Sequence, residues 1–296
     1  MRKKMKYIIY KVLAIITMLA CLTGCRTDNT ISSSDASNTA STEENNEIKV
    51  NFLNVGKADC IAIEIEDKLI MIDTGTTESI EVVDEYLELK GYDTIDMLFI
   101  THFDKDHVGG AAHLIENYNV GKVITTFYEA KVSDELDNYH AALEEKGITP
   151  DLVSSDETLN VGDVSFAIYP PQQTEYEKDT SNNSSLVIRM VYGDTSFLFA
   201  GDAQKERINE LLEIPDLQSD VLKIPHHGNL EKNSEDLIDY IDPDYAVITC
   251  SDEEPEDDEL VELLEDREIT TYLTRDGMVS ITSDGETLSV SQFVFM

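Results

Sequence analysis

The sequence predicts an α/β domain in which helices cover β-sheets. Apolar stretches typical of strands alternate with amphipathic stretches typical of helices through most of residues 47–296, which is the pattern of sheets with helices packed on their faces. Clusters of His and Asp follow directly after several strand-like stretches, where α/β folds build their sites. A stretch of this length lies within the range of one domain.

The individual elements follow from local patterns. β-branched and alternating apolar residues predict strands at Ile48 to Val55, Cys60 to Ile65, Leu69 to Ile72, Met97 to Ile100, Val164 to Tyr169, Leu186 to Tyr192, Phe197 to Ala200, Val221 to Ile224 and Tyr245 to Cys250. Apolar residues at helical spacing predict helices at Ser79 to Lys90, Ala111 to Tyr118, Asp134 to Lys146, Ala203 to Leu212, Glu235 to Tyr240 and Glu256 to Glu265. Cys60 and Cys250 lie in strand-like runs, which favours two buried thiols over a disulfide framework.

The first residues have the features of a bacterial lipoprotein signal. Basic residues gather between Arg2 and Lys11, and the apolar run that follows, Val12 to Leu22, is shorter than the roughly 20 residues of a membrane-spanning helix. The run ends in Leu22-Thr23-Gly24-Cys25, which resembles a lipobox. We therefore expect a signal peptide over residues 1–24, lipidation of Cys25, and export to the outer face of the cell membrane with the lipid as anchor.

The region after Cys25 differs in composition from the rest of the chain. Arg26 to Asn46 contains no aromatic residue and one Ile, too little apolar surface to order the segment, so residues 25–46 are expected to be a flexible tether before a folded domain at 47–296. The chain has a formal net charge of −38. Such a charge repels polyanions, so a surface that binds long nucleic acids is disfavoured. No protein partner can be inferred from the sequence.

The densest group of candidate metal ligands follows the predicted strand Met97 to Ile100. His102, Asp104, Asp106 and His107 lie within six residues there, and a tight loop after a strand can turn such side chains toward one point. The same ligand types recur after later strands, in Phe199-Ala200-Gly201-Asp202 and in Lys223-Ile224-Pro225-His226-His227-Gly228. These patterns predict a site that two cations share.

The order of these motifs resembles that of the metallo-β-lactamase superfamily. Its motifs are Asp-Thr-Gly, His-x-His-x-Asp-His, a third His, an Asp that bridges two metals and a last His, and here Asp73 to Gly75, His102 to His107, Asp202 and His226 or His227 stand in that order. The resemblance covers nearly all of residues 47–296. It implies an αββα sandwich, with two packed mixed sheets flanked by helices, and a hydrolase with two divalent metal ions.

Within the superfamily, the sequence is most similar to the soluble domain of the ComEC family of competence DNA-uptake channels. The likeness rests on Phe52 to Asp59, Thr101 to Gly110, Asn182 to Val187 and Leu222 to Gly228. Asn54, Lys57 and Ala58 depart from the Asp, Gln and Gly expected in that subgroup. The multi-span channel is missing from this sequence, so DNA transport is not implied.

The resemblance also implies a ligand set for each metal. Asp104 stands where the second His is usual, and no His lies between His140 and His226, so Asn182 or Asn183 is expected in the third place. The first metal would then bind His102, Asp104 and Asp202, an oxygen-rich and weak set that favours Mn²⁺ or Mg²⁺. The second would bind Asp106, His107, Asp202 and preferably His226, a set suited to Zn²⁺ or Mn²⁺.

The expected chemistry is hydrolysis by a metal-activated hydroxide. Asp106, His107 and Asp202 are the expected catalytic residues, with His227 as a donor to substrate or leaving group, or as a supporting residue. Asp73 is expected to orient a ligand or to cap a turn, and Ser185 to touch substrate or to cap its strand. Lys105 and Lys223 either steer an anion or offset neighbouring carboxylates.

The pair Asp106-His107 resembles phosphodiesterase-type members of the superfamily more than β-lactamases. Phosphodiester hydrolysis, including a nuclease-like activity, is therefore the leading functional hypothesis. A hydrolase of a small non-nucleic-acid ester or of a lactam is an alternative. A non-catalytic envelope binding protein with a degenerate metal site is another, and metal stoichiometry distinguishes it from the enzymes.

Overall fold

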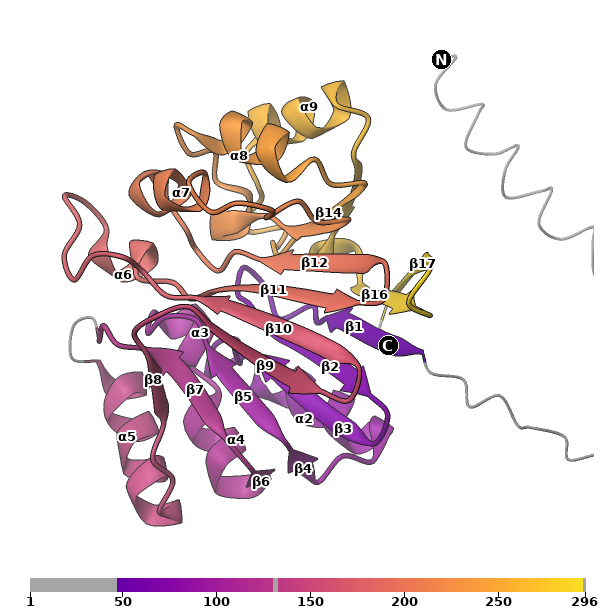
Figure 1. Ribbon diagram of the computed structural model, residues 1–296. Coiled ribbons are helices and arrows are strands. Elements are labelled where there is room, and N and C mark those ends of the chain that lie inside the picture. The colour runs from indigo at the N-terminus through magenta and orange to yellow at the C-terminus, as the bar shows by residue number, and fades with distance from the viewer. Residues whose placement is uncertain (1–46, 130–132, 295–296) are drawn as a thin grey trace, which may run out of the picture. The chain divides into compact units, whose positions relative to one another are not determined.

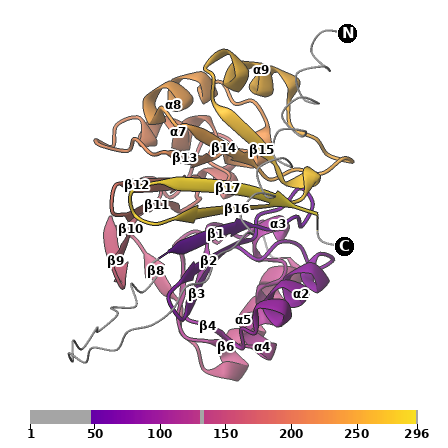
Figure 2. The same ribbon diagram turned by 90° about the vertical axis from the view of Figure 1, so that its right-hand side faces the viewer.

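The computed structural model describes residues 47–129 and 133–294, which form two mixed β-sheets packed face to face (Figure 1). Helices cover the outer face of each sheet, as Figure 2 shows from the side. The αββα sandwich predicted from the sequence is therefore confirmed. The predicted signal peptide at 1–24, Cys25 and the tether at 25–46 lie outside the described residues. None of the described helices is long and apolar enough to cross a membrane.

The first sheet combines an antiparallel and a parallel half. In spatial order its strands are β17 (Leu288–Phe293), β16 (Met278–Ser283), β1 (Ile48–Phe52), β2 (Ile61–Ile65), β3 (Lys68–Ile72), β5 (Met97–Ile100), β7 (Val123–Thr126) and β8 (Asp151–Val153). Pairing is antiparallel from β17 to β3 and parallel from β3 to β8. Its outer helices are α2 (Ile80–Lys90), α4 (Ala111–Asn117) and α5 (Asp134–Lys146), and β4 (Thr94–Ile95) pairs with β6 (Asn119–Val120) beside them.

The second sheet repeats this arrangement. Its strands in spatial order are β15 (Thr270–Leu273), β14 (Tyr245–Ile248), β13 (Val221–Lys223), β12 (Thr195–Phe199), β11 (Val187–Tyr192), β10 (Val164–Tyr169) and β9 (Glu157–Val161). Its outer helices are α7 (Lys205–Leu211), α8 (Ser234–Ile241) and α9 (Asp258–Asp266). Short turns of helix, α3 (Lys105–Val108), α6 (Thr180–Asn183), η1 (Pro225–Gly228) and η2 (Thr274–Asp276), follow or precede strands.

The strand residues alternate between two buried layers. In β3, Ile70 and Ile72 face the core between the sheets, whereas Leu69 and Met71 face the helices of the first sheet. Phe99 and Phe166 meet across the two sheets with ring centroids 6.1 Å apart. Because both faces of the central strands are buried, their sequences are nearly continuous apolar runs. These runs are the pattern from which the strands were predicted.

The predicted helices are all present, but several strands were not predicted. The missed strands are short or lie at or near the sheet edges, and some of them expose polar residues: β4, β6, β7, β8, β9, β15, β16 and β17. In β9, for example, Glu157, Thr158 and Asn160 are exposed. Cys60 and Cys250 are buried free thiols on the outer faces of opposite sheets.

Candidate metal centre

The candidate ligands lie where the parallel strands of the two sheets end. β3 leads to Asp73, β5 to His102, β12 to Asp202 and β13 to His227. Parallel strands end at the same edge of a sheet, and the two parallel halves bring these four segments together. The edge of the sandwich thus gathers polar side chains from segments far apart in the sequence.

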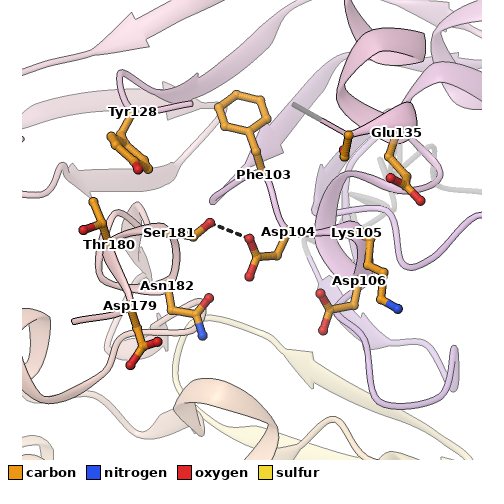
Figure 3. Close-up of a pocket in the computed structure, with 11 residues that line it drawn as sticks. Phe103, Asp104, Lys105, Asp106, Tyr128, Glu135, Asp179, Thr180, Ser181 and Asn182 are labelled. Atoms are coloured by element: carbon orange, nitrogen blue, oxygen red, sulfur yellow. Dashed lines mark hydrogen bonds between the residues drawn. The ribbon is translucent and has the colours of Figure 1, made fainter. Parts of the chain in front are cut away.

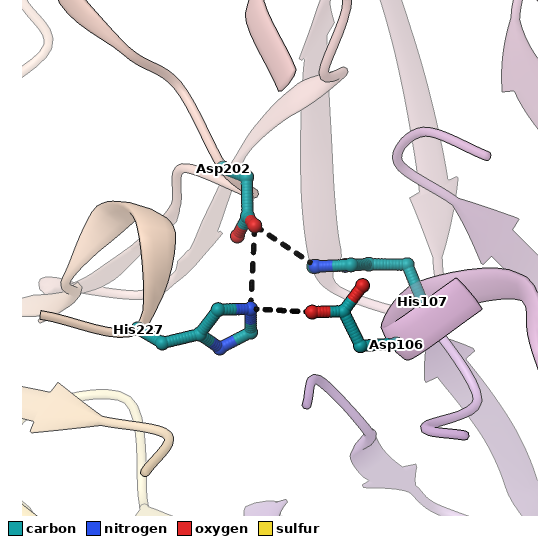
Figure 4. Close-up of side chains that lie close together, drawn as sticks. All are labelled: Asp106, His107, Asp202 and His227. Carbon is teal, nitrogen blue, oxygen red and sulfur yellow. Dashed lines mark ion pairs between the residues drawn. The ribbon is translucent and has the colours of Figure 1, made fainter. Parts of the chain in front are cut away.

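Asp106, His107, Asp202 and His227 form a tight group of side chains (Figure 4). The Oδ2 atom of Asp202 lies 3.2 Å from Nε2 of His107 and 3.2 Å from Nε2 of His227. The Nε2 atom of His227 also lies 3.3 Å from Oδ2 of Asp106. One ligand atom from each residue lies within 4.8 Å of the others, so a single ion could contact all four.

His102 and Asp104 extend this group. The Nε2 atom of His102 lies 3.9 Å from Oδ2 of Asp104 and 4.0 Å from Oδ2 of Asp202. The rings of His102 and His107 have centroids 4.0 Å apart. Asp202 therefore lies within reach of both His102 and His227, as required of a carboxylate shared between two ions.

The donor atoms fit divalent metal ions. Within the described residues, the buried atoms without a hydrogen-bond partner include Nε2 of His102, His107 and His227 and Oδ1 of Asp202. Such atoms are costly to bury unless a ligand binds them, and imidazole nitrogens and carboxylate oxygens are ligands of Zn²⁺ and Mn²⁺. One ion would be held by His102, Asp104 and Asp202, and a second by Asp106, His107, Asp202 and His227.

Asp73 fixes the orientation of His107. Its Oδ2 atom lies 2.8 Å from Nδ1 of His107, and its carboxylate accepts hydrogen bonds from the backbone N and the Oγ1 of Thr101 at 2.7 and 2.6 Å. A proton on Nδ1 of His107 donates to this carboxylate and leaves Nε2 free for a metal. Asp73 is thus placed to orient a ligand, one of the two roles expected for it.

Ser185 supports the neighbouring ligands in a similar way. Its Oγ atom lies 3.3 Å from Nδ1 of His102, accepts from the backbone N of Asp202 at 3.0 Å and donates to the carbonyl of Asn182 at 2.7 Å. It is fully buried. Ser185 is therefore placed to position the candidate ligands His102 and Asp202 rather than to contact substrate.

A buried network behind His227 was not recognised from the sequence. The Nδ1 atom of His227 lies 3.0 Å from Oγ1 of Thr249, which donates to Oδ1 of Asp59 at 2.6 Å. The other oxygen of Asp59 forms an ion pair with Lys223, whose Nζ donates to the carbonyl of Gly201 at 3.1 Å and lies 3.7 Å from Oδ1 of Asp202. Lys223 thus offsets carboxylates, the second of its two expected roles.

Opposite charges outweigh burial for most groups of the cluster. Burial opposes ionisation of Asp202, but the imidazoles of His227 and His107 hold its pKa well below the usual range. Burial also disfavours the charged form of His227, yet Asp202 and Asp106 raise its pKa to about 9. Burial and the neighbouring His107 lower the pKa of His102. Because a metal binds neutral imidazole, a metal bound here would displace protons, and its affinity would rise with pH.

The two adjacent histidines of η1 have different surroundings. His226 and His227 both have left-handed backbone conformations, with φ of +50° and +55°, which non-glycine residues rarely adopt. His227 is buried in the cluster, whereas Nε2 of His226 lies 3.3 Å from Nδ2 of Asn182 and its Nδ1 lies 3.2 Å from Oε1 of Glu231. The geometry therefore corrects the preference for His226 as the ligand: His227 is the residue that joins the cluster.

This difference predicts unequal effects of two alanine substitutions. We expect His227→Ala to weaken Mn²⁺ or Zn²⁺ binding on the order of 100-fold, because it removes a donor atom, and His226→Ala to weaken it less than about tenfold. Titration with each metal against a chelator of known affinity measures both. Equal losses in the two variants would contradict the assignment.

Of the two asparagines expected in the third place, only Asn182 lines the cavity beside Asp104 and Asp106. Asn183 is buried, and its Oδ1 accepts from the backbone N of Arg207 at 2.9 Å while its Nδ2 donates to the carbonyl of Lys178 at 3.0 Å. These bonds anchor α6 to α7. The geometry therefore corrects the alternative that Asn183 supplies a ligand oxygen.

A cavity of about 670 Å³ opens beside Asp104 and Asp106 (Figure 3). The α6 residues Thr180, Ser181 and Asn182 line its opposite wall, and Ser181 donates a hydrogen bond to Asp104 across it. The cavity thus gives a ligand access to the edge of the cluster.

The fold and this cluster agree with the family to which the chain belongs, the metallo-beta-lactamase superfamily, whose family model matches residues 53–251. The chain is 28% identical over 222 residues to ComE operon protein 3 of Bacillus subtilis. This match covers 68% of this chain and 28% of that protein. It is 27% identical over 208 residues to Recombination protein 2 of Haemophilus influenzae, covering 68% of this chain and 24% of that protein. The chain therefore spans about a quarter of the length of these relatives.

A solved structure with the same fold is the metallo-beta-lactamase fold protein YhfI from Bacillus subtilis. The match has a TM-score of 0.52 and 9% sequence identity, and covers 83% of this chain and 100% of that one. At this identity the likeness concerns the fold alone.

Proposed function

We propose that this chain is a metal-dependent phosphodiesterase that uses water as the nucleophile. The observation that supports this most is that Asp106 and His107 lie with Asp202 and His227 in one cluster. Within the described residues, the buried Nε2 atoms of its two histidines have no hydrogen-bond partner. When bound, two divalent metal ions supply Lewis-acid polarisation of the phosphoryl group and activation of water.

The protein's own residues hold the site in place before substrate arrives. Asp73 orients His107, Ser185 orients His102, and Thr249 orients His227. Groups that are already oriented need little rearrangement during the reaction, which favours catalysis. Asn182, on the opposite wall of the cavity, is placed to donate a hydrogen bond to a phosphodiester.

The net charge of the chain limits the size of the substrate that we propose. Relatives of this chain are named for recombination and competence, and nucleic acid is therefore one candidate substrate. The net charge of −38 repels a long polyanion, so we propose small phosphodiesters or short oligonucleotides. A small non-phosphate ester or lactam, or a binding role without catalysis, are the remaining alternatives.

Cleavage assays test the proposal directly. We expect the full-length protein with Mn²⁺ or Zn²⁺ to cleave bis(p-nitrophenyl) phosphate, and the double variant Asp106→Ala, His107→Ala to lose at least about 10³-fold of that activity, because the second metal loses two donors. A matched control is Asp84→Ala, His113→Ala, which removes a half-exposed Asp-His pair on α2 and α4. Absence of cleavage in folded protein with either metal, on this ester and on single-stranded DNA, would exclude phosphodiesterase activity on these substrates and favour the alternatives.

We further propose that the protein is exported and anchored by a lipid on Cys25. The reason is the lipobox-like Leu22-Thr23-Gly24-Cys25 after a short apolar run. Cys25→Ala should move most of the protein from the membrane fraction to the soluble fraction and abolish incorporation of labelled palmitate. Unchanged membrane association of a variant that carries no label would refute the lipid anchor.

A further inference from the structure

The cavity beside the metal centre has an unusual lining for a site that receives a phosphodiester (Figure 3). Its volume of about 670 Å³ is that of a small-molecule site. Aromatic rings and carboxylates line it together: Phe103, Tyr128, Glu135 and Asp179, besides the candidate ligands Asp104 and Asp106.

The charges that remain after metal binding are negative. Metal ions would offset Asp104 and Asp106, but Glu135 and Asp179 are not candidate ligands, and neither forms an ion pair with a basic side chain in the part of the chain that the structure describes. Lys105 is the one basic residue among those that line the cavity. The outer cavity therefore repels an additional anion and attracts a cation.

The aromatic residues favour a particular kind of cation. Phe103 lines the cavity but is only 5% exposed, because its ring packs on that of Tyr139 with centroids 5.8 Å apart, so the partly exposed Tyr128 offers the larger accessible aromatic surface. Tyr128 lines the cavity on the same side as α6, as the close-up shows. Aromatic faces with nearby carboxylates attract alkylammonium groups, whose charge is diffuse and whose methyl groups are apolar.

We infer that the substrate is a phosphodiester with an alkylammonium group on one arm, which this cavity binds while the phosphoryl group lies at the metal centre. This inference rests on the phosphodiesterase activity proposed above. In the reaction, the oxygen of water forms a new bond to phosphorus and the bond from phosphorus to the leaving oxygen breaks. The proton lost by the attacking water ends on the leaving oxygen or, when that oxygen departs as an anion, in the solvent. The positive charge fixes the orientation of the substrate and takes no part in bond making.

Two esters that differ only in charge test the inference. p-Nitrophenylphosphorylcholine and p-nitrophenyl 3,3-dimethylbutyl phosphate have the same shape, but the second has carbon in place of the quaternary nitrogen. We expect kcat/KM of the metal-loaded protein to be about tenfold higher for the choline ester, and this preference to fall to about twofold in Glu135→Gln, Asp179→Asn. Glu145→Gln, an exposed change on the same helix as Glu135, should keep the full preference.

A binding measurement separates this inference from the proposed function. Calorimetry on the metal-free protein should detect binding of choline, weakened several-fold in Glu135→Gln, Asp179→Asn, and weaker binding of its neutral isostere 3,3-dimethylbutan-1-ol. If bis(p-nitrophenyl) phosphate is cleaved but the two arm-bearing esters react equally, the inference is wrong and the proposed function stands. If no phosphodiester is cleaved, the proposed function fails, and equal binding of choline and 3,3-dimethylbutan-1-ol would overturn the inference as well.

Discussion

Asp202→Asn is expected to reduce phosphodiester cleavage at least about 10³-fold and to lower bound metal from two ions to at most one. The Oδ2 atom of Asp202 lies 3.2 Å from Nε2 of both His107 and His227 and 4.0 Å from Nε2 of His102, so no other side chain of the cluster reaches both candidate ion positions. An amide has no charge to offset two cations, and metal ions contribute several kcal/mol of transition-state stabilisation, of which each 1.4 kcal/mol is tenfold in rate.

Elemental analysis after dialysis against Mn²⁺ or Zn²⁺, together with rates on bis(p-nitrophenyl) phosphate, measures both effects. The matched control is Asp194→Asn in the exposed turn between β11 and β12, which should retain both ions and full activity. Circular dichroism establishes that both variants are folded. An Asp202→Asn protein that retains two ions and the wild-type rate would show that the metal centre lies elsewhere.

The sequence predicted the ligand-bearing segments because each follows a strand that is buried on both faces. His102, Asp106 and His107 come directly after β5, and Asp202 after β12, so an apolar run followed by polar residues marks each segment. Their order along the chain then resembles that of a known superfamily. The edge strands carry no such signal, because residues such as Glu157 and Asn160 of β9 are exposed and polar.

Two features of the site depend on three-dimensional detail that local pattern does not contain. Choosing between His226 and His227 requires the backbone conformation, since adjacent residues in a left-handed turn project in different directions. The ion pair of Asp59 and Lys223 joins the loop after β1 to the end of β13, and only the packing of the two sheets brings these together. Asp59 lay within a segment that supported the family resemblance, Phe52 to Asp59, which is the one sequence signal that could have identified it.

Lys223→Met is expected to lower the free energy of unfolding by about 3–5 kcal/mol, because it leaves a buried carboxylate without its counter-charge. Lys223 is 1% exposed, and its ammonium contacts Asp59 and lies 3.7 Å from Oδ1 of Asp202. Burial opposes its charge, but Asp59 and Asp202 raise the pKa of Lys223, so the ammonium stays protonated.

Urea unfolding of the metal-free protein measures the effect, and two further variants isolate its cause. The double variant Lys223→Met, Asp59→Asn should recover most of the lost stability, since no unpaired charge remains buried at Asp59. Lys122→Met breaks an exposed ion pair with Asp151 of 2.7 Å and should cost less than about 1 kcal/mol of stability.

Because Asp59 also holds Thr249 against His227, the double variant should still bind metal about 10- to 100-fold more weakly than wild type. Loss of stability without recovery in the double variant would mean that Lys223 acts by packing alone; recovery of both stability and metal affinity would mean that Asp59 does not position His227.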